Sequence, residues 1–366
     1  MDRTPDEWIG EYGIRRPLYV EYVRRVETLL KDLLKAGGID VIQVESRAKT
    51  VESFADKIQR KDRSDRNPFE SVTDLAGVRI ITYYTDDVKR VGKLIGNEFE
   101  IDVENSVSKS EELAKDQFGY RSDHYVAKLS ATRSKLIEWQ AYTGIPIEFQ
   151  VRTALQHAWA AVDHKIKYKS ANEAPTTLQR RLFQLSALFE LADEQFAVLR
   201  DQWAATFTAY SADVTSGQLH HVPIDTSSLA AYWNLSRTAA KVRTELAAEN
   251  LTDDSEVIEE ARLARDRRDS VRALREVGIT TLAQLDEYLQ SERFGLCKAA
   301  LVKYFEQPDA PLEIGEESLS PNSSLDDYLT MILTIDHPET VGDIEPRIYI
   351  DQDFIDGLKA AGANLR

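Results

Sequence analysis

One short segment of the sequence, residues 148–153, places three chemically different polar groups on one side of an expected strand. Its letters, EFQVRT, alternate, so Glu148, Gln150 and Arg152 would line one face while the residues between them face the other way. A carboxylate, an amide and a guanidinium in a row suit a site that handles phosphate groups and a metal ion. A solvated strand would alternate in the same way, so the segment alone leaves both interpretations open.

The sequence offers few ways to hold a metal ion or a nucleotide other than through carboxylates. It contains one cysteine and six histidines, and it has neither a G-x-x-x-x-G-K-[ST] nor a G-x-S-x-G motif. On one helix, His157 and His164 would lie about 10 Å apart along the axis, too far to share one zinc ion. A metal would therefore be a hard cation such as Mg²⁺, and Asp74 and Glu148 are the obvious pair to hold it.

Three basic residues could neutralise a triphosphate beside that metal, namely Arg47, Lys49 and Lys57. Asp74 itself comes just before a β-branched and aromatic run at 78–84 that predicts a buried strand. Each residue also has a simpler explanation, because lysines and arginines often cover a solvated helix face and an aspartate often caps a turn.

A third segment, residues 118–125, reads FGYRSDHY. Gly119 would free a turn, and Tyr120 offers a flat face on which a base could stack. Arg121 and His124 could contact phosphates. Each of these residues, taken alone, is more often structural.

The order of four motifs resembles that of the RelA/SpoT alarmone synthetase family. The motifs are S-R-x-K, D-L-x-G-x-R-I, G-Y-R-S-x-H and E-x-Q-V-R-T-x-x-x-H-x-W-A-x-x-[DE]-H-x-x-x-Y-K, and the resemblance spans roughly residues 15–205. It implies a nucleotidyltransferase-like mixed β-sheet flanked by helices. It also implies a cytosolic enzyme that transfers a pyrophosphate from ATP to the 3′-hydroxyl of GDP or GTP and so makes (p)ppGpp.

The resemblance also implies roles for the matching positions. Asp74 and Glu148 would be catalytic and would hold Mg²⁺, and Glu148 could take the proton from the attacking hydroxyl. Four residues would bind ATP: Arg47, Lys49, Lys57 and Arg79. Six residues would bind the acceptor: Tyr120, Arg121, His124, Gln150, Arg152 and His157.

Two departures from the family pattern matter. The sequence has no His-Asp dipeptide, which the metal-dependent hydrolase domain of long relatives carries, so we do not expect it to degrade alarmone. Where the family usually has Lys-x-Asn before Gly-Tyr, this sequence has Lys115 one step earlier. That lysine normally helps to grip the acceptor's phosphates, so another acceptor stays open: the 3′-terminal adenosine of tRNA, which some small toxic members modify. A third hypothesis is a nucleotide-sensing protein without turnover.

The hydrophobic pattern predicts an α+β domain followed by a mainly helical one. Helices are expected at 19–35, 51–58, 88–95, 154–169 and 182–203, and strands at 78–84, 99–107, 125–129 and 145–151. We expect a synthetase domain at residues 1–205, a polar linker at 206–228 and a regulatory or interaction domain at 229–366. In the last of these, strands are expected at 328–335 and 348–351 before a final helix.

The net charge of −16 is unevenly distributed. Residues 305–366 carry 14 acidic and 3 basic side chains, which leaves only −5 for the preceding 304 residues. Basic clusters occur at Arg15-Arg16, at Arg24-Arg25 and within 47–66, and they could hold a tRNA acceptor stem. Simple solvation explains the acidic end, but that end could also fold against the basic part and restrain it.

The sequence predicts a cytoplasmic protein. Its start lacks a signal-peptide pattern, no apolar run approaches the ~20 residues that span a bilayer, and one cysteine suits a reducing compartment. A membrane partner is therefore not expected, whereas homo-oligomerisation is left open.

Overall fold

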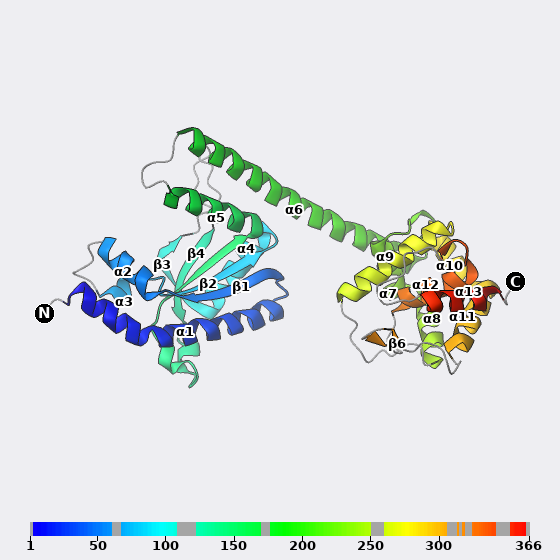
Figure 1. The fold of residues 1–366 in the computed structure, drawn as a ribbon, viewed down its shortest axis with the longest axis horizontal. Helices are drawn as coiled ribbons and strands as arrows, with labels where there is room; N and C mark the ends of the chain where they lie inside the picture. Colours follow the sequence, from blue (N-terminus) through cyan, green and yellow to red (C-terminus); the bar gives the residue numbers. More distant parts are fainter. Residues whose placement is uncertain are drawn as a thin grey trace. The chain divides into compact units, whose positions relative to one another are not determined.

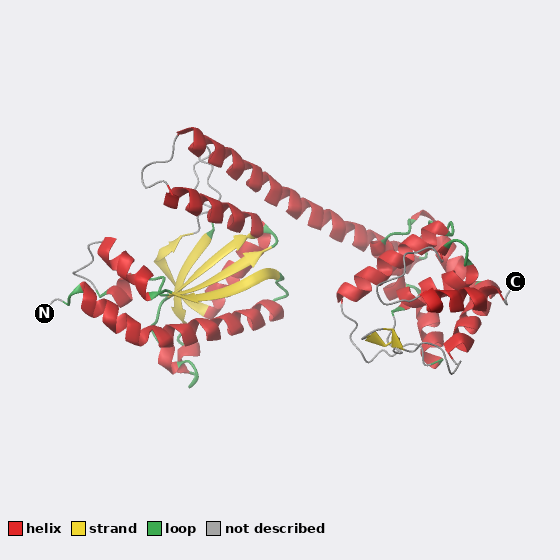
Figure 2. Ribbon diagram, in the orientation of Figure 1, coloured by secondary structure: helices red, strands yellow, loops and turns green. Residues whose placement is uncertain are grey.

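The computed structural model describes residues 3–60, 67–107, 122–169, 176–249, 260–305, 313–314, 317–318, 324–341 and 352–363. The chain divides into two compact units, Met1–Arg200 and Asp201–Arg366. Their helices and strands are shown in Figures 1 and 2.

A five-stranded mixed sheet forms the centre of the first unit (Figure 2). The strands are β1 (Val41–Ala48), β2 (Ala76–Thr82), β3 (Phe99–Val107), β4 (Asp123–Leu129) and β5 (Ile147–Thr153). They lie in the order β1-β2-β5-β4-β3, with β2 and β5 parallel and the other pairs antiparallel. Because β2 and β5 are parallel neighbours, they end at the same edge of the sheet.

The helices of this unit are α1 (Pro5–Ala36), α2 (Val51–Arg60), α3 (Pro68–Ser71), α4 (Thr85–Glu98), α5 (Ala154–Lys169) and the first part of α6 (Thr176–Ser216), which continues past Arg200 into the second unit. Two short 3-10 turns, Arg133–Lys135 and Gln140–Tyr142, precede β5. Helix α1 is longer than expected because it begins at a capping box, in which Thr4 and Glu7 each bond to the other's backbone. Helix α5 begins where expected, since Thr153 Oγ1 accepts a hydrogen bond from the backbone N–H of Gln156.

One face of the sheet forms the apolar core of the first unit together with α1 and α4. Ile147, Phe149 and Val151 of β5 have no exposed surface and share this core with residues of both helices. Helix α4 packs closely because Gly92 lacks a side chain: a Cβ there would lie 2.3 Å from Tyr125 Oη. With apolar residues on one face, the polar residues of the same strands are left for the other face.

The second unit is mainly helical, as the sequence predicts. After a 3-10 turn at Leu219–His221, its helices are α7 (Thr226–Leu235), α8 (Arg237–Ala248), α9 (Glu260–Glu276), α10 (Leu282–Gln290), α11 (Glu292–Phe305), α12 (Leu325–Asp336) and α13 (Gln352–Ala363). A short antiparallel pair, β6 (Glu313–Ile314) and β7 (Glu317–Ser318), lies between α11 and α12 in the chain. The unit has a hydrophobic core of its own, which includes Leu229, Tyr232 and Leu274.

Three sequence-based expectations differ from this structure. The strand expected at 328–335 is wrong, because these residues belong to helix α12, which Ser324 caps. A short apolar run cannot by itself distinguish a strand from a helix that is buried on most sides. The linker expected at 206–228 is shorter in the structure, since α6 continues to Ser216 and α7 begins at Thr226, which leaves only 217–225 between the two helices. The strand expected at 348–351 lies outside the described residues.

Part of the negative charge near the C-terminus is buried inside the second unit. Asp326 is 1% exposed, accepts a hydrogen bond from Trp233 Nε1 at 2.8 Å and lies 3.3 Å from Arg267 Nε. Asp336 is also buried and accepts a hydrogen bond from Arg293 Nε. These carboxylates are neutralised internally, so they cannot contribute to an acidic surface that restrains another domain.

The buried carboxylate of Asp193 on α6 generates a prediction about stability. It is 2% exposed and accepts a hydrogen bond from Thr153 Oγ1 at 2.7 Å, at the end of β5. Burial raises the pKa of Asp193 from its ordinary value of 3.8 to about 7. Between these two values the folded protein binds more protons than the unfolded chain, so the free energy of unfolding falls as the pH rises.

We predict that Asp193→Asn removes this pH dependence. A three-unit shift corresponds to at most about 4 kcal/mol of unfolding free energy lost between about pH 4 and pH 7. Urea unfolding at several pH values measures the effect. Glu194→Gln changes the exposed neighbouring carboxylate and should keep the wild-type slope. An unaltered slope in Asp193→Asn would contradict the prediction.

Candidate functional site

The register of β1, β2 and β5 places six residues in two rows on the sheet face opposite the core. The first row consists of Arg47, Gly77 and Glu148. The second row consists of Glu45, Arg79 and Gln150. Because neighbouring strands lie about 4.8 Å apart, each row brings its side chains within reach of one another.

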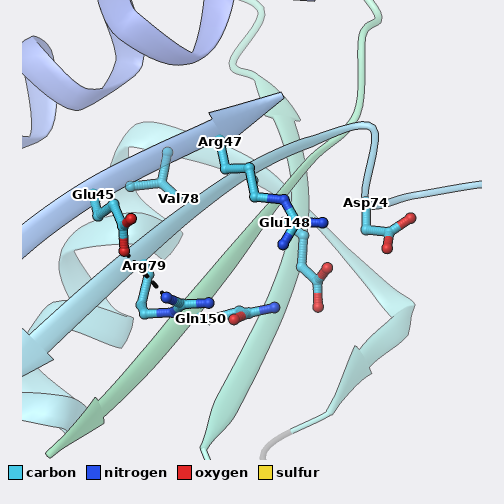
Figure 3. Close-up of a pocket in the computed structure, with 8 residues that line it drawn as sticks. Glu45, Arg47, Asp74, Val78, Arg79, Glu148 and Gln150 are labelled. Carbon is cyan, nitrogen blue, oxygen red and sulfur yellow. Dashed lines mark hydrogen bonds and ion pairs between the residues drawn. The ribbon is translucent and has the colours of Figure 1, made fainter. Parts of the chain in front are cut away.

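These six residues, together with Asp74 and Val78, line a cavity of about 190 Å³ (Figure 3). Figure 3 shows the side chains of Arg47, Glu148 and Gln150 projecting into the same space from two strands, with Asp74 at the edge of that space. Asp74 comes from the turn just before β2. A Cβ at Gly77 would make only ordinary contacts, 3.7 Å from the carbonyl oxygens of Arg47 and Glu148. Because glycine has no side chain, the position between the Arg47 guanidinium and the Glu148 carboxylate is open.

Asp74 lies between two ammonium groups. Lys49 Nζ donates to its Oδ2 at 2.7 Å, and Lys57 Nζ donates to its Oδ1, also at 2.7 Å. Burial raises the pKa of Asp74, but the hydrogen bonds and charges of the two lysines outweigh burial and hold that pKa below its usual value. Asp74 is therefore ionised at neutral pH. Its charge in turn compensates the ammonium group of Lys49, a residue that is only 8% exposed.

Glu148 is hydrogen-bonded to a short chain of polar side chains at the start of β4. Its Oε1 lies 2.7 Å from His124 Nδ1, and His124 Nε2 lies 2.8 Å from Ser122 Oγ. In the tautomer with a proton on Nδ1, His124 donates to the carboxylate and accepts from the serine hydroxyl. Glu148 is thus a carboxylate inside the cavity with a hydrogen-bonded route along which a proton can move.

Arg79 reaches across to β1, where its Nη1 donates to Glu45 Oε2 at 3.1 Å. Its Nε is buried and has no hydrogen-bond partner within the described part of the chain. Arg79 and Arg47 thus carry two guanidinium groups from neighbouring strands to the same cavity. A guanidinium plane of this kind can bind phosphate or stack on a base.

Arg152 and His157 are near this site but do not line the cavity. Arg152 lies one row further along β5, opposite Ile81, and is 7% exposed. Burial and the charge of Arg79 lower the pKa of Arg152 to about 10, and burial and the charges of Arg152 and Arg79 lower the pKa of His157. Among described residues, neither Arg152 Nε nor His157 Nδ1 has a hydrogen-bond partner. The charge of Glu45 opposes these shifts but does not cancel them, so an anion bound here would be favourable.

The structure therefore brings most of the sequence-derived site residues together. Arg47, Asp74, Arg79, Glu148 and Gln150 line the cavity, while Lys49 and Lys57 bond to Asp74 and His124 bonds to Glu148. Tyr120 and Arg121 lie outside the described residues. The sequence analysis missed Glu45 and Gly77. Glu45 could have been found, because it is two residues from Arg47 and would share its face on a strand.

The donor set of the cavity fits a magnesium ion. The described residues contain no group of three or more His, Cys, Asp or Glu side chains that could hold a metal. Mg²⁺ does not need such a group, because it commonly takes one or two carboxylates and completes its shell with water and substrate phosphates. Of the three carboxylates that line the cavity, Glu45 is bonded to Arg79, which leaves Asp74 and Glu148 as the candidate ligands, and a metal would have to share Asp74 with the two lysines.

The described helices include none that is both long enough and apolar enough to cross a membrane.

Comparison with known proteins shows what the first unit is similar to. Residues 46–173 match a family model described as "Region found in RelA / SpoT proteins". These residues hold the strands β2 to β5, both carboxylates and most of the cations described above. This segment is similar to the RelA/SpoT region, in agreement with the resemblance of the four motifs.

Two relatives and one solved structure illustrate the match. GTP pyrophosphokinase YwaC of Bacillus subtilis (strain 168) is 27% identical over 168 residues, which is 45% of this chain and 77% of YwaC. GTP pyrophosphokinase YjbM of the same organism is 27% identical over 172 residues, which is 46% of this chain and 76% of YjbM. The crystal structure of the small alarmone synthetase 1 from Bacillus subtilis aligns at 23% identity with a TM-score of 0.44. It covers 53% of this chain and 97% of that protein.

The opposing effects on Asp74 lead to a prediction about its pKa. Replacing either lysine removes one of the two groups that offset burial, so Lys49→Met should raise the pKa of Asp74 above its wild-type value. An NMR titration of the Asp74 carboxyl carbon measures the shift. Lys31→Met, which removes an exposed lysine paired with Glu27, should leave the pKa of Asp74 unchanged. A pKa equal to that of the wild type in Lys49→Met would show that the lysine does not control this carboxylate.

Proposed function

We propose that the first unit is an ATP-dependent pyrophosphokinase that transfers the β,γ-pyrophosphate of ATP to the 3′-hydroxyl of GDP or GTP. The observation that carries this proposal is the cavity in which Asp74, held by two lysines, and Glu148 occur together with Arg47 and Arg79. The RelA/SpoT match and the GTP pyrophosphokinase relatives support the same activity.

ATP fits the positive side of this cavity. The ammonium groups of Lys49 and Lys57 and the guanidinium of Arg47 supply three positive charges, which suits a triphosphate that carries several negative charges. Arg79, from the second row, offers a planar group on which the adenine can pack. A site of this kind orients the triphosphate before reaction, and positioning provides much of the catalysis in phosphoryl transfer.

Asp74 and Glu148 would hold a Mg²⁺ ion, which when bound supplies charge neutralisation at the phosphate oxygens. This assignment is part of the proposal and rests on the fit of the two carboxylates to such an ion.

The reaction is an in-line displacement at the β-phosphorus of ATP. The 3′-oxygen of the acceptor forms the new P–O bond, and the bond between the β-phosphorus and the α,β-bridging oxygen breaks, so that AMP leaves with that oxygen. The proton of the 3′-hydroxyl passes to Glu148, whose carboxylate is hydrogen-bonded to His124. The product carries the pyrophosphate on its 3′-oxygen.

The acceptor side would be formed by Gln150 and His124, with Tyr120 and Arg121 from outside the described residues. Arg152 and His157 would complete it. The buried guanidinium of Arg152, whose Nε has no hydrogen-bond partner among the described residues, supports an acceptor with free phosphates, because an anion would add to the charge compensation that Glu45 provides. GDP and GTP meet this condition, whereas the 3′-terminal adenosine of tRNA brings no 5′-diphosphate.

The basic residues of α1 give little support to the tRNA alternative. Arg15 lies 2.5 Å from a carboxylate oxygen of Glu11, and Arg24 and Arg25 both bond to Glu21. Because these three arginines already have carboxylate partners on the same helix, they offer less free charge to a nucleic-acid backbone than the sequence suggests, and only Arg16 of the two clusters has no such partner among the described residues.

We predict that Asp74→Asn and Glu148→Gln each abolish the formation of AMP from ATP in the presence of an acceptor. Each change removes a negative charge from the cavity while it keeps the shape of the side chain. The measurement is AMP released per enzyme, with thermal unfolding to verify the fold. Asp86→Asn, which alters an exposed carboxylate paired with Arg200, is a matched control and should be fully active. Retention of more than about a tenth of the rate in both variants would contradict the assignment.

The acceptor can be identified with ATP labelled at its γ-phosphate, since this phosphate travels with the transferred group. The full-length protein is given GDP, GTP or deacylated tRNA in separate reactions. We expect label in a guanosine nucleotide that carries a 3′-pyrophosphate. Label in tRNA would replace the proposal with the toxin hypothesis, and no transfer to any of the three would favour a nucleotide-sensing protein.

A further inference from the structure

Helix α1 holds the backbone of Lys49 from one side. Tyr12 Oη donates a hydrogen bond to the carbonyl oxygen of Lys49 at 2.7 Å, and Arg16 Nε donates to the same oxygen at 3.1 Å. On the other side, the backbone N–H of Lys49 donates to the carbonyl of Leu75 at 2.9 Å. The main chain of Lys49 is thus fixed between α1 and the residue that follows Asp74, which aims its ammonium group at that carboxylate.

Arg16 differs from the other arginines of α1 in its partners. Arg15, Arg24 and Arg25 each bond to a glutamate of the same helix. Arg16 is half-buried, and its one hydrogen bond within the described part of the chain goes from Nε to the carbonyl of Lys49. Its two terminal nitrogens therefore carry a positive charge that no carboxylate of the described residues compensates through an ion pair.

This charge belongs to the same neighbourhood as the cavity. Burial raises the pKa of Tyr12 to about 12, and the charges of Arg16, Asp74 and Arg47 all act on its hydroxyl. The hydroxyl of Tyr12 and the charges around it therefore lie close together. Arg16 also acts on the exposed carboxylate of Glu52. Its guanidinium bonds to the backbone of Lys49, which with Lys57 holds Asp74, and cations grouped in this way suit a ligand with several negative charges.

We propose that Arg16 is a further residue of the donor-nucleotide site: its Nε, together with Tyr12, positions Lys49, and its terminal nitrogens bind the β- and γ-phosphates of ATP. This inference rests on the proposed function, because it assumes that the cavity receives ATP. It adds a residue from the first helix to a site otherwise formed by β1, α2, β2 and β5.

The test compares two nucleotides that differ only in the phosphates at issue. The methylene analogue AMPCPP, which cannot be cleaved between its α- and β-phosphates, and AMP are titrated into the full-length protein by calorimetry. We expect Arg16→Gln to weaken AMPCPP binding about tenfold, since a hydrogen bond to a charged group contributes about 1.5–3 kcal/mol. The affinity for AMP should change less than about twofold, because AMP lacks both phosphates.

Two further variants serve as controls. Arg24→Gln changes an exposed arginine of the same helix that is paired with Glu21, and it should alter neither affinity by more than about twofold. Arg16→Lys keeps the charge but loses the Nε donor, so it should weaken AMPCPP binding by a smaller factor, about threefold, and leave AMP binding unchanged. If Arg16→Gln does not fold, Arg16→Lys carries the test.

Two results would overturn the inference. An equal loss of AMP and AMPCPP affinity would show that Arg16 only maintains the fold, and unchanged AMPCPP affinity would show that it has no part in the site. A wild-type protein that does not bind AMPCPP would instead refute the proposed function, and the inference with it. The two failures are therefore distinguishable.

Discussion

The carboxylate of Asp74, held between the ammonium groups of Lys49 and Lys57, is the interaction on which the rest of the site depends. Its three members come from the end of β1, from α2 and from the turn before β2. Without the aspartate, the ammonium groups of Lys49 and Lys57 would repel each other beside the cavity. Without the lysines, burial would favour the neutral acid, which is a poor metal ligand. The charge state of the site is thus set jointly by segments that meet only in the folded protein.

The sheet separates packing from chemistry by alternating its residues. On β5, Phe149 and Val151 are fully buried in the core, whereas Glu148 and Gln150 face the cavity. A shift of register by one residue would exchange these two sets, so the hydrophobic core also fixes the position of the polar rows. In the first row, Arg47 and Glu148 provide charged groups, whereas Gly77 between them has no side chain and leaves space.

Much of this arrangement could be predicted from particular residues, and some of it could not. The alternation at 148–153 predicts both the strand and the shared face, and Thr153 predicts the start of α5. Strand β1 was missed because it is an edge strand with only two residues, Val44 and Ala48, in the core, which is too few for a hydrophobic pattern. The sequence predicts Arg47, Lys49 and Lys57 near the metal site, but it does not predict that the two lysines bond to Asp74, because that depends on the pairing of β1 with β2. The helix at 325–336 was mistaken for a strand because its burial is nearly complete.

The close packing at Gly92 has a consequence for variation among related sequences. Tyr125 occupies the space that a side chain at position 92 would need, and the residue before it on β4, His124, faces Glu148 on the opposite side of the sheet. Even a methyl group on this helix would therefore force the ring of Tyr125, the neighbour of His124 on β4, out of its present position. We expect evolution to tolerate little change at this position, although Gly92 belongs to the hydrophobic side and touches no reacting group.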